Sequence, residues 1–211
     1  MKRYFKLCTY LVVAASFISA HAGSYDDFLM SVRVDNAGTV NELLARGFDP
    51  NAPDEKGQVG LFLALQDGSP KVLAALLAHP GIKPDVPNAS DETPLMMAAL
   101  RGNVEGMQLL LARGAVVNRP GWTPLHYAAT GPQARAVALL LDRGAEVDAP
   151  SPNRTTPLMM ACRYGTDAAA ELLLARGASL RLRNDRDMSA ADFARSVGRT
   201  ALAARLDALA R

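Results

Sequence analysis

The sequence predicts an all-α solenoid of stacked helix-turn-helix units, and three observations indicate this fold class. A Thr-Pro-Leu triplet begins at Thr93, Thr123 and Thr156, at spacings of 30 and 33 residues. A glycine follows each of these threonines after 21 residues, inside a leucine-rich phrase such as LLLARGAVVN. Aromatic residues make up only 6% of the chain, which disfavours sandwich and barrel folds, whose strands favour Tyr, Phe and Trp. A repeat this short cannot bury its apolar face alone, so neighbouring units must stack into a shared core.

Residues 1–22 have the pattern of a secretory signal peptide. Lys2, Arg3 and Lys6 form a basic segment, an apolar run of 12 residues follows at 7–18, and the segment closes with Ser-Ala-His-Ala. Cleavage is expected after Ala22. A run of this length spans about 18 Å as a helix, which is too short to cross a bilayer. We therefore expect a periplasmic protein with no stable membrane insertion after cleavage.

Removal of that segment changes the charge of the chain from +2 to −1. A charge near zero argues against a nucleic-acid partner. Residues 23–92 carry 11 acidic and 5 basic side chains, whereas residues 93–211 carry 10 acidic and 15 basic ones. This polarity would orient a charged partner, although arginines at helix ends also complement helix dipoles. Only Cys162 remains as a cysteine, so packing rather than a disulfide must stabilise the fold.

Each unit is expected to contain two short helices. In the first, Thr caps the N-terminus, Pro suits the first turn, and a glycine ends the helix. The second carries the leucine-rich phrase, and a loop rich in Pro, Asn and Asp leads to the next unit. The units are expected at about 25–57, 58–91, 92–121, 122–154 and 155–187, with a C-terminal cap at 188–211. The first unit and the cap lack the triplet, as terminal repeats often do.

These phrases resemble the ankyrin-repeat family. The segment TPLHYAA, which begins at Thr123, is similar to the family signature Thr-Pro-Leu-His-x-Ala-Ala. The phrase Arg-Gly-Ala-x-Val-Asn/Asp is similar to the end of the family's second helix. The resemblance extends over about residues 25–200. It implies an ankyrin-repeat solenoid that binds a protein partner through its concave face, by its finger loops and the exposed positions of its first helices.

Five residues in those positions are the candidate partner-binding residues. They combine aromatic rings with arginines, the side chains that dominate binding hot spots. They are Arg101, Arg119, Trp122, Arg163 and Tyr164. Trp122 is the only tryptophan of the chain and directly precedes a Thr-Pro-Leu triplet. The alternative interpretation is that Trp122 packs against the neighbouring finger.

A difference in loop length indicates the same place. The segment from Gly114 to Thr123 is three residues shorter than the corresponding segment from Gly144 to Thr156. A shorter finger would leave a notch beside Trp122. Variation in the loops on one face of a repeat protein usually marks its binding side, although a neutral deletion is an alternative.

The remaining reactive side chains are expected to be structural. His126 stands where the family has a histidine that bridges backbone groups of the turn. Cys162 takes an alanine position that faces the core. Met96, Met97, Met159 and Met160 stand in phase on their helices, which favours core packing over redox or metal chemistry. The chain has no catalytic motif and no metal-ligand spacing, so we expect no enzymatic activity, no metal and no cofactor.

The predicted function is that of a non-enzymatic protein-binding module, exported to the periplasm and monomeric on its own. Whether it protects an enzyme, neutralises a toxin as an immunity protein, or acts as a scaffold is left open. One alternative is a structural protein that stabilises the cell envelope without a dedicated partner. Another is a redox or metal-handling role for Cys162 and the methionines.

Overall fold

The computed structural model describes residues 23–211, and these residues form consecutive helix pairs. A helix over residues 23–33 is followed by α2 (Ala37–Ala45). The later pairs are α3 (Gly60–Asp67) with α4 (Pro70–Ala78), α5 (Pro94–Arg101) with α6 (Val104–Ala112), α7 (Pro124–Thr130) with α8 (Ala134–Asp142), α9 (Pro157–Tyr164) with α10 (Asp167–Ala175), and α11 (Ala190–Ser196) with α12 (Thr200–Leu209). Each of the later pairs falls within one of the ranges expected from the repeat, whereas the first helix begins at residue 23, before the expected start at about 25. The predicted all-α solenoid is confirmed, and the expected signal peptide lies outside the described residues.

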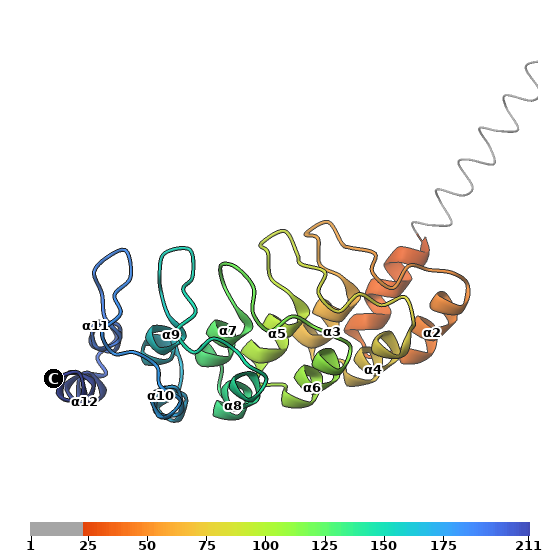
Figure 1. Cartoon of the computed structure of the whole chain (residues 1–211). Helices are drawn as coiled ribbons and strands as arrows, with labels where there is room; N and C mark the ends of the chain where they lie inside the picture. The colour runs from red at the N-terminus through yellow and green to blue at the C-terminus, as the bar shows by residue number, and fades with distance from the viewer. Residues whose placement is uncertain (1–22) are drawn as a thin grey trace, which may run out of the picture.

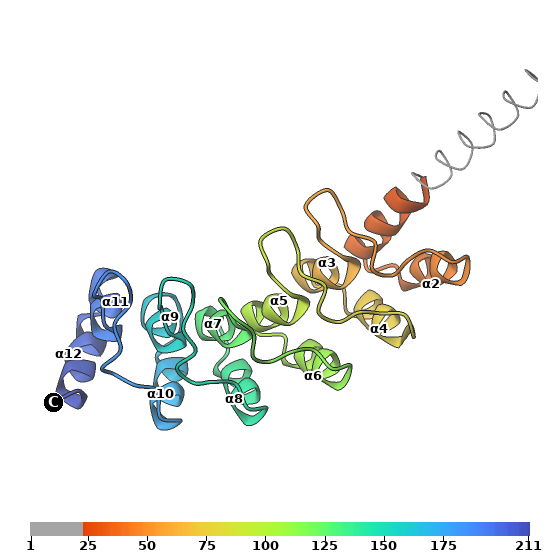
Figure 2. The ribbon, with the colours of Figure 1, turned by 45° about the horizontal axis from the view of Figure 1, so that its top comes forward.

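The helices form two rows (Figure 1). Helices α3, α5, α7, α9 and α11 contact one another in order and form the inner row, while α2, α4, α6, α8 and α10 form the outer row. The connections from the outer row back to the inner row rise as fingers on one side of the molecule. Figure 2 shows that the stack bends along its length. We call the surface formed by the inner-row helices and the fingers the concave face.

The Thr-Pro-Leu triplets begin inner-row helices, as predicted. Thr93 is the N-cap of α5, and its hydroxyl accepts a hydrogen bond from the amide of Met96 at 3.4 Å. The amide of Thr93 donates in return to the sulfur of Met96 at 3.4 Å. Thr156 and Met159 repeat both contacts in α9, with the same distances of 3.4 Å. The third helical position therefore supplies an acceptor for the N-cap amide.

His126 supplies that acceptor in α7. Its Nδ1 accepts a hydrogen bond from the amide of Thr123 at 3.2 Å, and its Nε2 donates to the carbonyl oxygen of Thr155 at 2.9 Å. The ring is fully buried. The prediction that His126 bridges backbone groups is confirmed.

Glycine ends two inner-row helices where they approach the preceding helix. A Cβ atom on Gly165 would lie 2.0 Å from the carbonyl oxygen of Ala129, and one on Gly131 would lie 2.8 Å from that of Leu100. Both distances are shorter than van der Waals contact, so no larger residue fits without moving the helices apart. These glycines allow α5, α7 and α9 to pack closely.

The Asn or Asp that closes the leucine-rich phrase ties each unit to the next. Asn118 Oδ1 accepts from the amide of Glu146 at 3.0 Å, and its Nδ2 donates to the carbonyl oxygen of Gly144 at 2.8 Å. Asp148 accepts in the same way from the amide of Ser179 at 3.0 Å. These side-chain hydrogen bonds to the backbone of the next unit thus fix the position of successive units relative to one another.

A continuous apolar core runs between the two rows. Met96 and Met159 are each 1% exposed, which confirms that they fill the core, and Met160 is partly buried against it. Cys162 is fully buried and has a free thiol, and its burial raises the pKa of the thiol to about 12. No helix within residues 23–211 combines the length and the apolar character that a membrane crossing requires.

Candidate partner-binding surface

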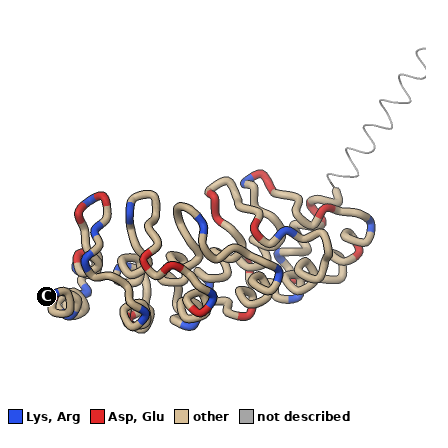
Figure 3. The backbone as a smooth tube through the Cα atoms, in the orientation of Figure 1, with Lys and Arg blue, Asp and Glu red and all other residues tan. Residues whose placement is uncertain are grey.

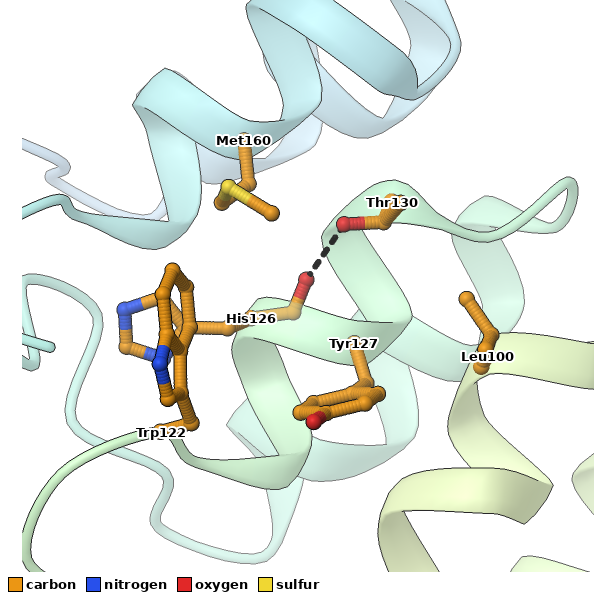
Figure 4. A pocket seen from close by; sticks show the side chains of 6 residues that line it. All are labelled: Leu100, Trp122, His126, Tyr127, Thr130 and Met160. Atoms are coloured by element: carbon orange, nitrogen blue, oxygen red, sulfur yellow. Dashed lines mark hydrogen bonds between the residues drawn. The ribbon is translucent and has the colours of Figure 1, made fainter. Parts of the chain in front are cut away.

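Trp122 lies at the base of the shortest finger, directly before α7. Its ring is partly buried and meets the ring of His126 edge-on, with centroids 5.2 Å apart and an interplanar angle of 77°. Figure 4 shows this contact from close by. Trp122 therefore packs against a side chain of its own unit, and its position is fixed by a histidine that the backbone holds from both sides.

Trp122 lines a pocket of about 210 Å³, which we call the apolar pocket. It is lined by residues from three inner-row helices and the finger base: Leu100, Trp122, His126, Tyr127, Thr130 and Met160. In Figure 4, Leu100 belongs to α5, Tyr127 and Thr130 to α7, and Met160 to α9. The Thr130 hydroxyl is directed to the carbonyl oxygen of His126, at 2.9 Å. The pocket is therefore suited to an apolar side chain.

A second pocket of about 240 Å³ lies on the other side of Trp122 and Met160, and we call it the arginine pocket. It is lined by Trp122, Asn153, Thr155, Met160, Arg163, Tyr164, Asn184, Arg186, Met188 and Phe193. Apart from Trp122, these residues come from α9, α11 and the last two fingers. Because both pockets share Trp122 and Met160, they form one stretch of the concave face.

Arg163 and Tyr164 lie side by side at the end of α9 and line the arginine pocket. The Tyr164 side chain is 56% exposed, and Arg163 Cζ lies 5.2 Å from the centroid of its ring. Arg163 Nη1 donates to the hydroxyl of Ser196 at 3.2 Å. Arg163 Nε is buried and has no hydrogen-bond partner within residues 23–211. An arginine stacked on an exposed ring is a favourable arrangement for binding a protein.

Arg101 and Arg119 lie outside both pockets, so the structure unites only three of the five predicted residues. Arg101 Nη2 donates to the carbonyl oxygen of Gln66 and thereby ties α5 to the end of α3. Arg119 pairs with Asp91 of the preceding finger, and its side chain is only 20% exposed. Both arginines are held by residues of neighbouring units. Spacing in the sequence placed them next to Trp122, because it does not show which neighbouring residue a long side chain reaches.

A hollow of about 500 Å³ lies beside the shortest finger, where the loop length predicts a notch. It is lined by Asn118, Arg119, Pro120, Gly121, Thr123, Glu146, Ala149 and Pro150. Figure 1 shows this finger, between α6 and α7, rising less far than its neighbours. Trp122 itself lines the other two pockets and not this hollow.

Glu92 anchors the finger that precedes the apolar pocket. It accepts a hydrogen bond from the Tyr127 hydroxyl at 2.9 Å and another from Asn88 Nδ2 at 2.9 Å. Burial, together with the bond to Glu92, raises the pKa of Tyr127 far above its ordinary value. Tyr127 is therefore a neutral donor that fixes this side of the pocket.

The charge on the fingers differs along the stack, and the last finger, before α11, carries both acidic and basic side chains (Figure 3). Acidic side chains are prominent on the fingers before α3 and α5, whereas Arg119 and Arg154 stand on the fingers before α7 and α9. The arginine pocket lies in the basic half. Within the described chain, no group of three or more His, Cys, Asp or Glu side chains is arranged to hold a metal ion.

The five predicted residues leave out several residues that line the pockets. For some of these, an equivalent position in another repeat could have indicated their place on the surface. Met188 precedes α11 as Trp122 precedes α7, so the two occupy equivalent positions. Leu100 and Arg163 also lie at equivalent places, one residue before the ends of their helices. Arg186 is at a finger tip, where the repeat sets no residue type, and only the bend of the finger brings it to Tyr164.

Comparison with known families identifies the repeat. Residues 28–120 and 116–184 match the family model described as ankyrin repeats. A Danio rerio protein named as a palmitoyltransferase, ZDHHC13, is 32% identical over 168 residues, which cover 79% of this chain but 21% of that protein. The Danio rerio ankyrin repeat and SAM domain-containing protein 6 is 37% identical over 70 residues, covering 33% of this chain and 10% of that protein. The match thus spans a fifth or less of either relative.

A solved structure shows the same fold. It is a complex of a predatory endopeptidase from Bdellovibrio bacteriovorus with an immunity protein. The matching chain superposes with a TM-score of 0.74 at 24% identity, over 86% of this chain and 97% of that chain. The likeness therefore covers almost the whole stack of helix pairs.

Proposed function

Because the chain belongs to the ankyrin-repeat family, we propose that it is a non-enzymatic module that holds a protein partner on its concave face. The observation that carries this proposal is the pair of pockets that share Trp122 and Met160. Aromatic and arginine side chains set in pockets near the centre of a surface supply most of the binding energy in protein interfaces. Trp122, Tyr164 and Arg163 provide such a centre here.

The predicted residues have different roles in this proposal. Trp122 and Tyr164 are the anchors, and Arg163 is held between Tyr164 and Ser196. Arg101 and Arg119 support the surface by holding neighbouring units in place. Their removal would weaken binding indirectly.

We further propose that residues 1–22 direct export to a bacterial periplasm. The support is the basic segment, the apolar run and the small residues before Gly23. The expected mature N-terminus is Gly23, which mass spectrometry of the protein from a periplasmic fraction would reveal. Protein that retains Met1 and remains in the cytoplasm would contradict this proposal.

A second candidate role is that of an immunity protein that protects its producer from an exported enzyme. It is favoured by the solved complex, in which a chain of this fold accompanies an endopeptidase. Inhibition of a hydrolase encoded or exported together with this protein would support the role. A tight complex with a non-enzymatic partner would instead support a scaffold.

The binding surface is tested by Trp122→Ala and Tyr164→Ala in a pull-down from periplasmic extract. We expect each to reduce partner capture at least tenfold, because each removes an anchor from the centre of the face. Leu109→Ala is the matched control, since Leu109 is 40% exposed on the outer row. Circular dichroism monitors folding. If capture by the folded Trp122→Ala protein equals that by Leu109→Ala, the site is wrongly assigned, and the absence of any partner would favour the envelope-structural alternative.

A further inference from the structure

The arginine pocket contains donors that lack acceptors and no acidic side chain. Its polar lining residues are Asn153, Thr155, Arg163, Tyr164, Asn184 and Arg186. The absence of a carboxylate is notable because ten acidic side chains lie within residues 93–211. The pocket therefore has an electrostatic preference for a negative group, whereas the apolar pocket beside it has none.

Arg163 is the clearest of the unsatisfied donors. Of its three nitrogens, only Nη1 makes a hydrogen bond within residues 23–211, to Ser196. Nε is buried without a partner, which is an unfavourable state for a guanidinium nitrogen. The Nε and Nη2 edge is one with which an arginine binds a carboxylate through two parallel hydrogen bonds. The exposed Tyr164 ring packs on this guanidinium, with Arg163 Cζ 5.2 Å from the ring centroid.

The last finger contributes the other donors. Asn184 Oδ1 accepts from the amides of Arg186 and Met188, both at 3.0 Å, so its Nδ2 is left to face other partners. The Arg186 side chain forms no ion pair within residues 23–211 and is exposed. A negative group in the pocket would therefore meet the Arg186 guanidinium and the Asn184 amide from the finger side.

Two of the three acidic side chains on or near this finger, Asp187 and Asp192, are paired with other groups. Asp187 and Asp192 each lie 3.7 Å from Arg183 Nη1. Asp192 also accepts from the amide and hydroxyl of Ser189, and these bonds are the main reason why the pKa of Asp192 is lowered. Asp185 follows Asn184 but does not line the pocket. None of these carboxylates neutralises Arg163 or Arg186 directly.

We propose that the arginine pocket binds the carboxylate of an Asp or Glu side chain on the partner protein, next to an apolar side chain that enters the apolar pocket. The inference rests on the proposed protein-binding function and specifies the partner's chemistry. Trp122 and Met160 separate the two side chains, so the partner segment must present them close together. The carboxylate supplies the acceptors that Arg163 and Arg186 lack, and the apolar side chain displaces water from Leu100 and Tyr127.

Blocked tetrapeptides test the inference without knowledge of the partner. The probes are Ac-Gly-Leu-Glu-Gly-NH2, its Glu-Leu isomer, and the same two peptides with Gln in place of Glu. Binding to the purified protein is followed by NMR, through the indole N–H of Trp122 and the methyl groups of Met160 and Met188. We expect at least one Glu peptide to shift all three signals, with a Kd at least tenfold below that of its Gln counterpart.

Two variants locate the carboxylate. Arg186→Gln is expected to raise the Kd of the better Glu peptide at least fivefold and to leave the Gln peptide unchanged. Arg181→Gln is the matched control, because Arg181 is an exposed arginine of the same segment outside the pocket. Arg163→Gln should act as Arg186→Gln does, and a thermal melt checks that it folds. A Kd that rises equally with Arg181→Gln would indicate general electrostatic attraction and overturn the assignment.

Other outcomes also overturn the inference. Equal binding of Glu and Gln peptides would show an apolar surface without carboxylate recognition. Displacement of the Glu peptide by an equal concentration of acetate would show a small-anion site that makes no use of the apolar pocket. No shift from any peptide at millimolar concentration would show that the pockets do not bind such a segment. Loss of partner capture in Trp122→Ala would still support the proposed function, so failures of the two proposals are distinguishable.

Discussion

His126 is buried with both ring nitrogens hydrogen-bonded, and these bonds fix its protonation state. Because Nδ1 accepts from the Thr123 amide while Nε2 donates to the Thr155 carbonyl, the ring is neutral in the folded protein. Burial lowers the pKa of His126 from 6.5 to about 4. Protonation would require both a charge in the core and the loss of the bond at Nδ1. The folded state therefore resists protonation more strongly than the unfolded chain does.

This difference predicts that acid destabilises the protein between pH 6.5 and pH 4. In that window the unfolded chain binds a proton at His126 that the folded chain does not bind, so the free energy of unfolding falls as the pH falls. The pKa values of 6.5 and about 4 correspond to a loss of about 2 kcal/mol between pH 7 and pH 5. Urea unfolding at the two pH values measures this loss.

His126→Met is the control for that experiment, since methionine occupies the equivalent position in α5 and α9. The variant keeps an acceptor for the Thr123 amide but has no titrating group. Between pH 7 and pH 5, its free energy of unfolding should fall by about 2 kcal/mol less than that of the natural protein. Equal losses in the two proteins would show that other groups cause the acid sensitivity.

The structural role of single residues could be predicted where it depends on their own unit, and not where it depends on a neighbour. His126, Met96 and Met159 are fixed by the turn that contains them, so the repeat pattern placed them correctly. Arg101 and Arg119 have long side chains whose partners belong to the preceding unit, Gln66 and Asp91. Which acceptor such a side chain reaches depends on how two units stack, and the sequence pattern does not determine that geometry.

At the scale of helices, the close packing of α9 on α7 depends on Gly165. A Cβ there would lie 2.0 Å from the carbonyl oxygen of Ala129, and a backbone atom cannot rotate away as a side chain can. We expect Gly165→Ala to reduce the free energy of unfolding by about 2–3 kcal/mol, as overpacking does. Gly23→Ala is the control, because nothing lies within 4 Å of that position. Similar denaturation midpoints for the two variants would contradict the close approach.

The last helix pair is held to α9 by Arg199. Its Nη1 donates to the carbonyl oxygens of Ala161, Cys162 and Gly165, at 2.8, 2.9 and 3.2 Å, and Nη2 pairs with Asp167. These carbonyl oxygens lie at or just after the end of α9, where the carbonyl oxygen of Ala161 also accepts from the amide of Gly165 at 3.1 Å. The single guanidinium therefore joins the start of α12 to the end of α9 and the start of α10.

Arg199→Ala is expected to lower the free energy of unfolding by about 2 kcal/mol, because it removes hydrogen bonds from a charged donor and leaves carbonyl oxygens unsatisfied. Arg205→Ala is the comparison, since Arg205 pairs with Glu171 and both side chains are about half exposed. Such an exposed pair contributes between zero and 1 kcal/mol. Chemical denaturation of both variants measures the difference. Equal effects would mean that Arg199 acts only as another surface charge.

The order and type of the helices followed from the triplet and the leucine-rich phrase, and the comparison with the ankyrin-repeat family confirms that interpretation. Helix starts were predictable because Thr, Pro and the third residue act locally. The fingers were predictable only as loops. Their bend brings Arg186 and Asn184 to Tyr164, and no local rule relates those residues. This is why three of the five predicted site residues lie together while most of the arginine pocket was missed.

On the scale of the whole molecule, the helix pairs of residues 23–211 follow one another in a row, and the main contacts of each pair are with its neighbours. In such a protein a terminal unit can open without unfolding the rest. Cys162 lies on α9, next to the last pair, and Arg199 donates to its carbonyl oxygen. The thiol is fully buried and its pKa is raised to about 12, so it reacts only after opening. Its labelling rate therefore reports the stability of the C-terminal end.

We predict that an excess of a thiol reagent labels Cys162 through opening of the C-terminal end. Arg199→Ala should then accelerate labelling by about thirtyfold without denaturant, corresponding to its expected 2 kcal/mol. Phe28→Ala is the decisive control, because Phe28 is fully buried in the first unit, and its truncation should lower global stability by about 3 kcal/mol or more. If opening is local, Phe28→Ala leaves the labelling rate in water nearly unchanged while shifting the global denaturation midpoint. The opposite outcome is that Phe28→Ala accelerates labelling by the factor that corresponds to its loss of global stability. The stack then unfolds as one cooperative unit, and the C-terminal end does not open on its own.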